Sequence, residues 1–183
     1  MQTLTILQII AIAIAVICAA IDFRTRKIPN LITFPSWGIG IILNFVLLGA
    51  QAGLWAIVGL IVGVFIMMLP DPRNKVGFGD CKLMGAMGAF LGWKIVVIAW
   101  GYYALSYGLI ALVRLLTAIP WRSFKAMVHA ASVGAPATLD AEGAAKINKT
   151  MKEKVPIGPA VAIGVILAVL LEKATLQFLG FAG

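Results

Sequence analysis

The stretch KLMGAMGAFLGWKIVVIAWGYYALSYGLIALVRLL, residues 82–116, decides the fold of this 183-residue chain. If it were one helix, it would cross a membrane once. Gly92, Trp93 and Lys94 instead indicate a turn between a short helix over 82–91 and a longer one over 95–116. A helix of about 12 residues rises only about 18 Å, well short of a bilayer core of about 30 Å. We therefore expect a short helix followed by a returning one.

Composition places the rest of the chain in lipid. Hydrophobic residues make up 62% of it and the mean hydropathy is +1.02, whereas soluble domains are roughly 45–50% apolar. The apolar runs lie at about 4–21, 31–49, 54–69, 82–91, 95–116 and 157–171. The polar stretch 117–155 is too short and too rich in alanine and glycine to bury a core of its own. These patterns predict an all-α polytopic membrane protein with about six transmembrane helices, a short fourth helix, and one domain over 1–183.

Charge predicts the orientation of these helices. The formal net charge is +8, and no lysine or arginine precedes Arg24, so the first run lacks the basic start of a secretory signal and should be a retained helix. The basic residues cluster in three loops: Arg24, Arg26 and Lys27; Arg73 and Lys75; and Arg122, Lys125, Lys146, Lys149, Lys152 and Lys154. The positive-inside rule makes these loops cytoplasmic and the N-terminus external, in the inner membrane. A single crossing over 82–116 would put the third loop outside, so charge also favours the turn. Anionic lipid explains the cations, and we expect no nucleic-acid partner.

The cytoplasmic loop 117–155 contains one amphipathic segment. Its apolar and basic residues alternate at helical spacing, as is typical of a helix in the membrane interface: Trp121, Phe124 and Val128 against Arg122, Lys125 and His129. His129 is the single histidine, and because no nucleophilic serine or cysteine motif accompanies it, we assign it no chemistry.

Two aspartates, Asp22 and Asp80, each lie where an apolar run meets a basic loop. Two predicted crossings separate them, so both belong to the same face of the membrane. Acidic residues beside a bilayer are costly and usually functional. We therefore expect the two carboxylates to share one site.

A pair of carboxylates supports aspartic-protease chemistry, in which one activates a water and the other protonates the substrate carbonyl. This chemistry needs no metal and no cofactor, and we expect neither. Gly77 and Gly79 would allow positive φ angles and the close approach of a substrate backbone, and Asn30 would cap the second helix.

The sequence contains two cysteines. Cys18 and Cys81 form neither a Cys-x-x-Cys motif nor a zinc set, and both are expected to be buried thiols, with Cys81 as a side chain that could line the site.

A small proton-coupled transporter would use the same aspartates as a relay, but its membrane helices offer little further polarity beyond Thr33 and Asn44. A non-catalytic membrane scaffold is the second alternative.

The motifs resemble those of the type IV prepilin peptidases, which are polytopic aspartic proteases of the Gly-x-Gly-Asp class. Three stretches carry the resemblance in the same order as in that family: Asp22-x-Arg24-x-x-x-Ile28-Pro29-Asn30, Gly77-x-Gly79-Asp80-x-Lys82, and Pro156-Ile157-Gly158-Pro159. The resemblance implies that Asp22 and Asp80 are catalytic. It implies that the other residues shape the two loops, position substrate, or open the last helix.

The resemblance also implies a substrate and a subtype. The substrate would be a prepilin, with a short basic leader followed by a hydrophobic helix, cleaved at the cytoplasmic face. Long bacterial members carry Cys-x-x-Cys pairs associated with methylating the new N-terminus, and this sequence has none. It is similar to the short peptidases of tight-adherence (Flp-type) pili, which implies cleavage without methylation. Archaeal preflagellin peptidases have related motifs and remain an alternative lineage.

Overall fold

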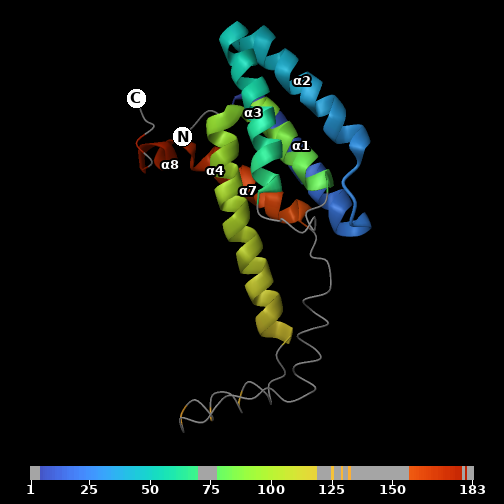
Figure 1. The fold of residues 1–183 in the computed structure, drawn as a ribbon, viewed down its shortest axis with the longest axis vertical. Helices are drawn as coiled ribbons and strands as arrows, with labels where there is room; N and C mark the ends of the chain where they lie inside the picture. The colour runs from blue at the N-terminus through green and yellow to red at the C-terminus, as the bar shows by residue number, and fades with distance from the viewer. Residues whose placement is uncertain are drawn as a thin grey trace. The chain divides into compact units, whose positions relative to one another are not determined.

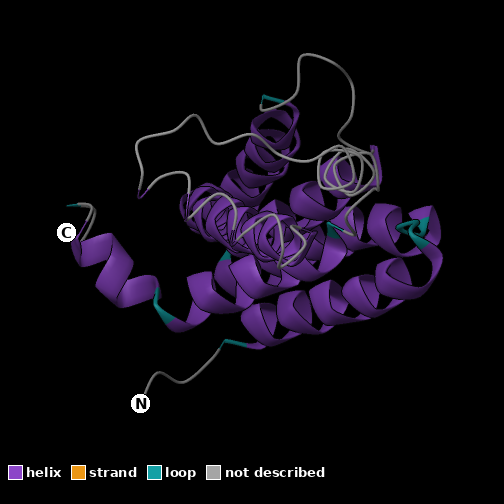
Figure 2. Cartoon of the chain, turned by 90° about the horizontal axis from the view of Figure 1, so that it is seen from below, coloured by secondary structure: helices purple, strands orange, loops and turns teal. Residues whose placement is uncertain are grey.

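A computed structural model describes residues 5–69, 78–118, 125, 129, 132, 157–178 and 180. These residues form six helical elements: α1 (Ile6–Thr25), α2 (Asn30–Leu48), α3 (Ala50–Met68), α4 (Phe78–Ala118), α7 (Gly158–Leu170) and α8 (Glu172–Phe178) (Figure 1). None of the described residues lies in a strand (Figure 2), so the predicted all-α class is confirmed.

The chain divides into two compact units, Met1–Ser106 with Pro156–Gly183, and Tyr107–Val155. All the contacts discussed below lie within the first unit. Most of the predicted 117–155 loop, including Trp121, Phe124 and Val128, lies outside the described residues, so the interfacial helix and the single domain stay predictions.

Helix length and apolarity make this a multi-pass membrane protein. Four helical spans are long and apolar enough to cross a bilayer, namely α1, α2, α3 and Phe78–Thr117. Together α7 and α8 give a fifth candidate, bent by 77° at their junction. The count of six crossings and the external N-terminus stay predictions.

The predicted turn inside 82–116 is confirmed at Gly92. This residue has a φ of 76° and a ψ of 172°, a non-helical conformation that glycine adopts without a steric penalty. Figure 1 shows the segments of α4 on either side of it running in opposite directions. The first segment, 78–91, would rise about 21 Å if regular, which is short of a bilayer core of about 30 Å.

Glycines bring this short segment against α2 and α3. A Cβ built on Gly63 of α3 would lie 2.5 Å from the Met84 carbonyl oxygen, and one on Gly40 of α2 would lie 3.0 Å from the carbonyl carbon of Ala89. Gly88 and Gly59 likewise leave no room for a side chain between their backbones. The small residues thus let these helix backbones pack closely together.

A second seam joins α1 to α7, which pack against each other. The buried face of α1 carries Leu7, Ala11, Ala15, Cys18, Ala19 and Asp22. Near the start of α1 the Gln8 side-chain amide donates a 2.7 Å hydrogen bond to Glu172, and near its end Asp22 accepts one from Gly158. Residue 8 thus pairs with residue 172, and residue 22 pairs with residue 158. The spacing is fourteen positions on each side and the order is reversed, so the two segments run antiparallel. The short α8 was not expected from the sequence; Thr175 ties it to Tyr102 through a 2.8 Å hydrogen bond.

Candidate active site

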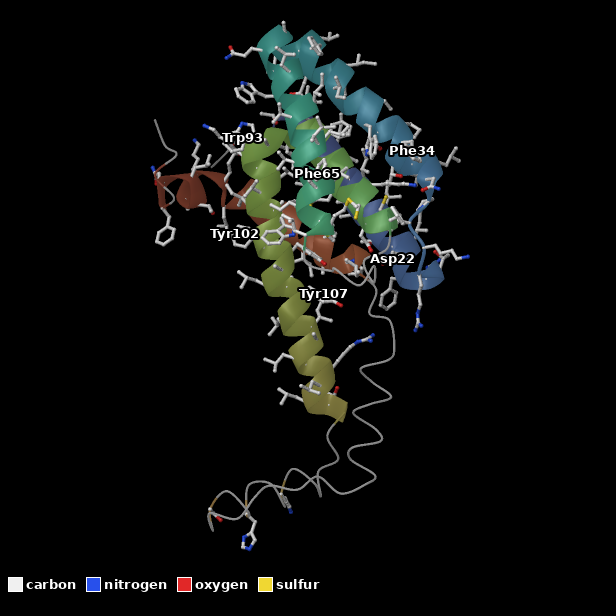
Figure 3. All side chains as sticks on the ribbon, viewed as in Figure 1. Asp22, Phe34, Phe65, Trp93, Tyr102 and Tyr107 are labelled. Carbon is white, nitrogen blue, oxygen red and sulfur yellow. The ribbon has the colours of Figure 1, made fainter. Side chains whose placement is uncertain are left out.

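Asp22 lies inside the last turn of α1, at the helix end where the sequence predicted it, although α1 continues four residues beyond the apolar run that ends at residue 21. The helix continues to Thr25 and ends at Arg26, whose left-handed φ of 53° lets its amide donate to the Asp22 carbonyl oxygen at 2.8 Å. The Asp22 side chain is only 5% exposed. It therefore belongs to the buried α1 face, and Figure 3 shows it at the end of α1 beside the start of α7.

The Asp22 carboxylate is held by the backbone of α7. The amide of Gly158, the first residue of α7, donates a buried 2.9 Å hydrogen bond to Asp22 Oδ2. First-turn amides have no partner within their own helix, and the N-terminal end of a helix favours negative charge. A Cβ on Gly158 would lie 2.8 Å from Asp22 Cβ and 2.9 Å from Oδ2, so only glycine permits this approach without a shift.

Asp80 also lies within a helix, because α4 begins at Phe78 rather than at the predicted residue 82. Its side chain is 7% exposed. The preceding Gly79 packs against Ile28, and a Cβ built on Gly79 would lie 3.1 Å from Ile28 Cβ. This contact is with a side chain of the protein itself, so the close approach of a substrate backbone to Gly79 stays a prediction. For Gly79 the expected positive φ is wrong, because this residue lies inside α4 and the described glycines with positive φ are Gly49, Gly92 and Gly180. For Gly77, outside the described residues, it stays a prediction.

Lys82 fastens the start of α4 to the start of α2. Its ammonium donates a 3.1 Å hydrogen bond to Asn30 Oδ1 and lies 4.5 Å from the centre of the Phe34 ring, while its carbonyl accepts a 2.9 Å hydrogen bond from the Trp37 indole. The predicted capping role of Asn30 is wrong, because Asn30 is the first residue of α2 and no side chain caps that helix. With the Gly79–Ile28 contact, these bonds bring the two aspartate motifs to one end of the bundle.

Asn44 holds the far end of the short segment. Its side-chain amide is buried and lies within hydrogen-bond distance of three carbonyl oxygens, those of Gly40 at 2.9 Å, Ala89 at 3.0 Å and Phe90 at 3.3 Å. The break at Gly92 interrupts the helical bonds that the last two carbonyls would otherwise accept. Asn44 is therefore a helix cap supplied by a neighbouring helix.

The remaining predicted residues surround this framework. Arg24 is exposed in the last turn of α1, Pro29 immediately precedes α2, and Pro159 is the second residue of α7. Gly77 and Pro156 lie outside the described residues. Cys18 and Cys81 are buried free thiols, as expected.

The sequence analysis missed the roles of Phe34, Trp37 and Asn44. A signal for the polar face of α2 was present, because its buried residues Thr33, Ser36, Gly40 and Asn44 recur at helical spacing. In a membrane helix such a stripe faces the interior of the bundle.

The chemistry available at this end of the bundle is that of carboxylates. No three histidine, cysteine or acidic side chains gather closely enough to hold a metal ion within the described parts of the chain. Two buried aspartates lie there, and a carboxyl group can accept or donate a proton.

Comparison with known proteins gives one consistent result. A model of the type IV leader peptidase family matches residues 9–134, which include both aspartates. The chain is 31% identical over 98 residues to a prepilin leader peptidase/N-methyltransferase of Klebsiella pneumoniae, covering 47% of this chain and 40% of that protein. It is 27% identical over 131 residues to one of Escherichia coli strain K12, covering 61% and 56%, and 35% identical over 99 residues to one of Dickeya chrysanthemi, covering 47% and 32%.

The chain thus spans about a third to a little over half of the length of these relatives. No solved structure matches it. The family match covers 126 of the 183 residues, and its region contains α1 from residue 9 onward and all of α2 to α4, with both buried aspartates. The chain belongs to the type IV leader peptidase family.

Proposed function

We propose that this protein is an aspartic endopeptidase of the inner membrane that removes the basic leader from type IV prepilins of the Flp type at the cytoplasmic face. The observation that carries the proposal is the pair of buried aspartates at one end of the bundle, Asp22 in α1 and Asp80 in α4. The contacts of Gly79 with Ile28 and of Lys82 with Asn30 support their cooperation, because these contacts join the two motifs.

In the proposed reaction the two aspartates divide the proton transfers. One carboxylate accepts a proton from water as the water oxygen bonds to the scissile carbonyl carbon, and the other, in its acid form, gives its proton to the carbonyl oxygen. The tetrahedral intermediate collapses when its C–N bond breaks. The new amine takes a proton from the aspartate that gained one, and one hydroxyl of the intermediate returns its proton to the other aspartate as the carbonyl re-forms. Substrate binding would complete the arrangement, since many active sites close only around their substrate.

The basic residues next to Asp22 have a different role in this proposal. Arg24, Arg26 and Lys27 are all exposed, and they would repel a basic leader. We assign them to orientation and to anionic lipid at the cytoplasmic surface. The sequence contains two cysteines in total and so no Cys-x-x-Cys pairs, and we therefore propose cleavage without methylation by these 183 residues.

The proton-coupled transporter finds little support in the polar residues that it would need. Asn44 is engaged as a helix cap, and the Thr33 hydroxyl lies 3.5 Å from carbonyl oxygens of Pro29 and Asn30 in its own helix turn. These contacts account for both buried side chains without a proton relay.

The test is co-expression with an Flp-type prepilin, followed by mass spectrometry of the pilin. The wild-type protein should remove the leader and add no methyl group, whereas Asp22→Asn and Asp80→Asn should each leave the leader in place. Glu172→Gln is the matched control, because it also converts an acid to an amide but retains an oxygen for the Gln8 hydrogen bond. Cleavage by either aspartate variant, or a retained leader with well-folded wild-type protein, would contradict the proposal.

A further inference from the structure

We propose that Gly158 is a positioning residue for Asp22, and that the start of α7 holds this carboxylate in its working orientation. The inference rests on the proposed function. It identifies a backbone group, in a helix far along the chain from both aspartate motifs, on which the cleavage reaction depends.

The first support is the hydrogen bond itself. Gly158 donates to Asp22 Oδ2 at 2.9 Å in a buried environment, where losing a bond is more costly than in water. An aspartate side chain has only two torsions, so fixing one oxygen together with the α1 backbone leaves the carboxylate little freedom.

The second support is steric. A Cβ added at residue 158 would lie closer than 3.0 Å to both Asp22 Cβ and Asp22 Oδ2. Neither obstacle is the end of a long flexible side chain, because Asp22 is itself fixed in the last turn of α1 by the helix end at Arg26. An alanine must therefore displace either the carboxylate or the start of α7.

The third support is the close packing of α1 against α7, which places the Gly158 amide beside the Asp22 carboxylate. The α1 face below Asp22 carries only small residues through Ala11, Ala15 and Cys18, which are fully buried. The α7 residues Ala160, Val161 and Val165 are fully buried as well. Close packing on both sides leaves Asp22 and residue 158 little room to separate, so a methyl group added at residue 158 must be accommodated at the carboxylate itself.

Kinetic comparison of three glycine-to-alanine variants tests the inference. A displacement of about 1 Å costs roughly 100-fold in rate, so Gly158→Ala should lower kcat about 100-fold with KM changed by less than about threefold. Gly38→Ala is the control with nothing within 4 Å of the new methyl group. Gly164→Ala is the control for packing alone. Gly164 lies in α7, as Gly158 does, but its new methyl group would meet the Ala99 carbonyl oxygen of α4 at 2.7 Å, away from Asp22.

Both controls should keep kcat within about threefold of the wild type for the folded fraction. Equal kcat losses in Gly158→Ala and Gly164→Ala would overturn the inference, because they would mean that packing is responsible. Near-normal kcat in Gly158→Ala would overturn it as well.

A second measurement needs neither cleavage nor a folded Gly158→Ala protein. Hydrogen exchange of the Gly158 amide, followed by NMR of protein labelled with 15N-glycine, should be slow in the wild type. It should stay slow in Asp22→Asn, whose amide oxygen still accepts the bond, and become at least about tenfold faster in Asp22→Ala, with the Gly164 amide as internal reference. Equal exchange rates of the Gly158 amide in all three proteins would overturn the inference that this amide holds the Asp22 carboxylate. Failure of the wild type to cleave any prepilin would instead count against the proposed function, and the exchange result would show which of the two has failed.

Discussion

Replacing Asn44 by leucine tests whether the short segment of α4 depends on a cap from α2. Leucine matches the shape of asparagine closely and removes both of its amide protons. It therefore leaves the carbonyls of Ala89 and Phe90, now at 3.0 and 3.3 Å from Asn44 Nδ2, without this donor inside the bundle.

The expected loss follows from the number of bonds that one amide can make. Two protons serve three carbonyl oxygens, two of them on α4, so about 1.3 bonds on average cross from α2 to α4. Interhelical hydrogen bonds in membrane proteins average about 0.6 kcal/mol and reach about 1.7 kcal/mol. Asn44→Leu should therefore lower the free energy of unfolding by about 1–2 kcal/mol.

The assay is reversible unfolding in mixed micelles with increasing SDS, followed by tryptophan fluorescence and circular dichroism. Ser36→Ala is the matched control, because Ser36 is equally buried on the same face of α2 but its hydroxyl bonds only to Ile32 of its own helix. Ser36→Ala should lower the free energy of unfolding by less than about 0.5 kcal/mol. Equal free energies of unfolding for Asn44→Leu and the wild type would refute the role of Asn44 as a helix cap. Below its unfolding transition Asn44→Leu should still cleave prepilin, whereas a proton relay through Asn44 would lose its function.

Three further outcomes are expected around Asp80 and its helix. Lys82→Met should lower the cleavage rate severalfold and Lys82→Arg should retain most of it, since only arginine can still bond Asn30 and stack on Phe34; equal rates would contradict the role of Lys82 as a fastening. Cys81→Ser should keep most activity in the same cleavage assay, because the proposed reaction uses no thiol, and complete loss would give Cys81 a function. Incubation with EDTA should leave the rate unchanged, and a loss that added metal restores would point to a bound ion.

The sequence predicted the features that depend on apolar length and on charge. The hairpin at Gly92 followed from a glycine beside Trp93 and Lys94 and from the lysines of the 117–155 loop, and the structure contains that break. The location of Asp22 and Asp80 at helix ends followed from the boundaries of the apolar runs. Both kinds of feature are set by local composition, which a single sequence displays directly.

Helix ends and tertiary polar contacts could not be predicted in the same way. The sequence analysis ended the first helix at 21 and began the fourth at 82, because apolarity ends there, whereas the helices continue through charged residues to Thr25 and from Phe78. A helix end depends on where backbone groups find other partners, as Arg26 illustrates. The bonds of Asn44, Trp37 and Gly158 join residues 45 or more positions apart, and no local pattern specifies such pairs.

The polar anchors of the two aspartates come from different neighbours. Asp22 is held by the first amide of α7, while the helix that carries Asp80 is fastened to α2, by Trp37 at Lys82 and by Asn44 at Ala89 and Phe90. The bonds of Gly158 and Asn44 use backbone groups that a helix start or a helix break leaves without an internal partner, whereas the Trp37 bond joins a carbonyl inside the helix. At the first two points the irregular backbone and the buried polar side chains satisfy each other. In a bilayer these bonds have no water to replace them. The break that shortens α4 and the start of α7 are therefore the points at which the helices that carry the two aspartates are held in the bundle.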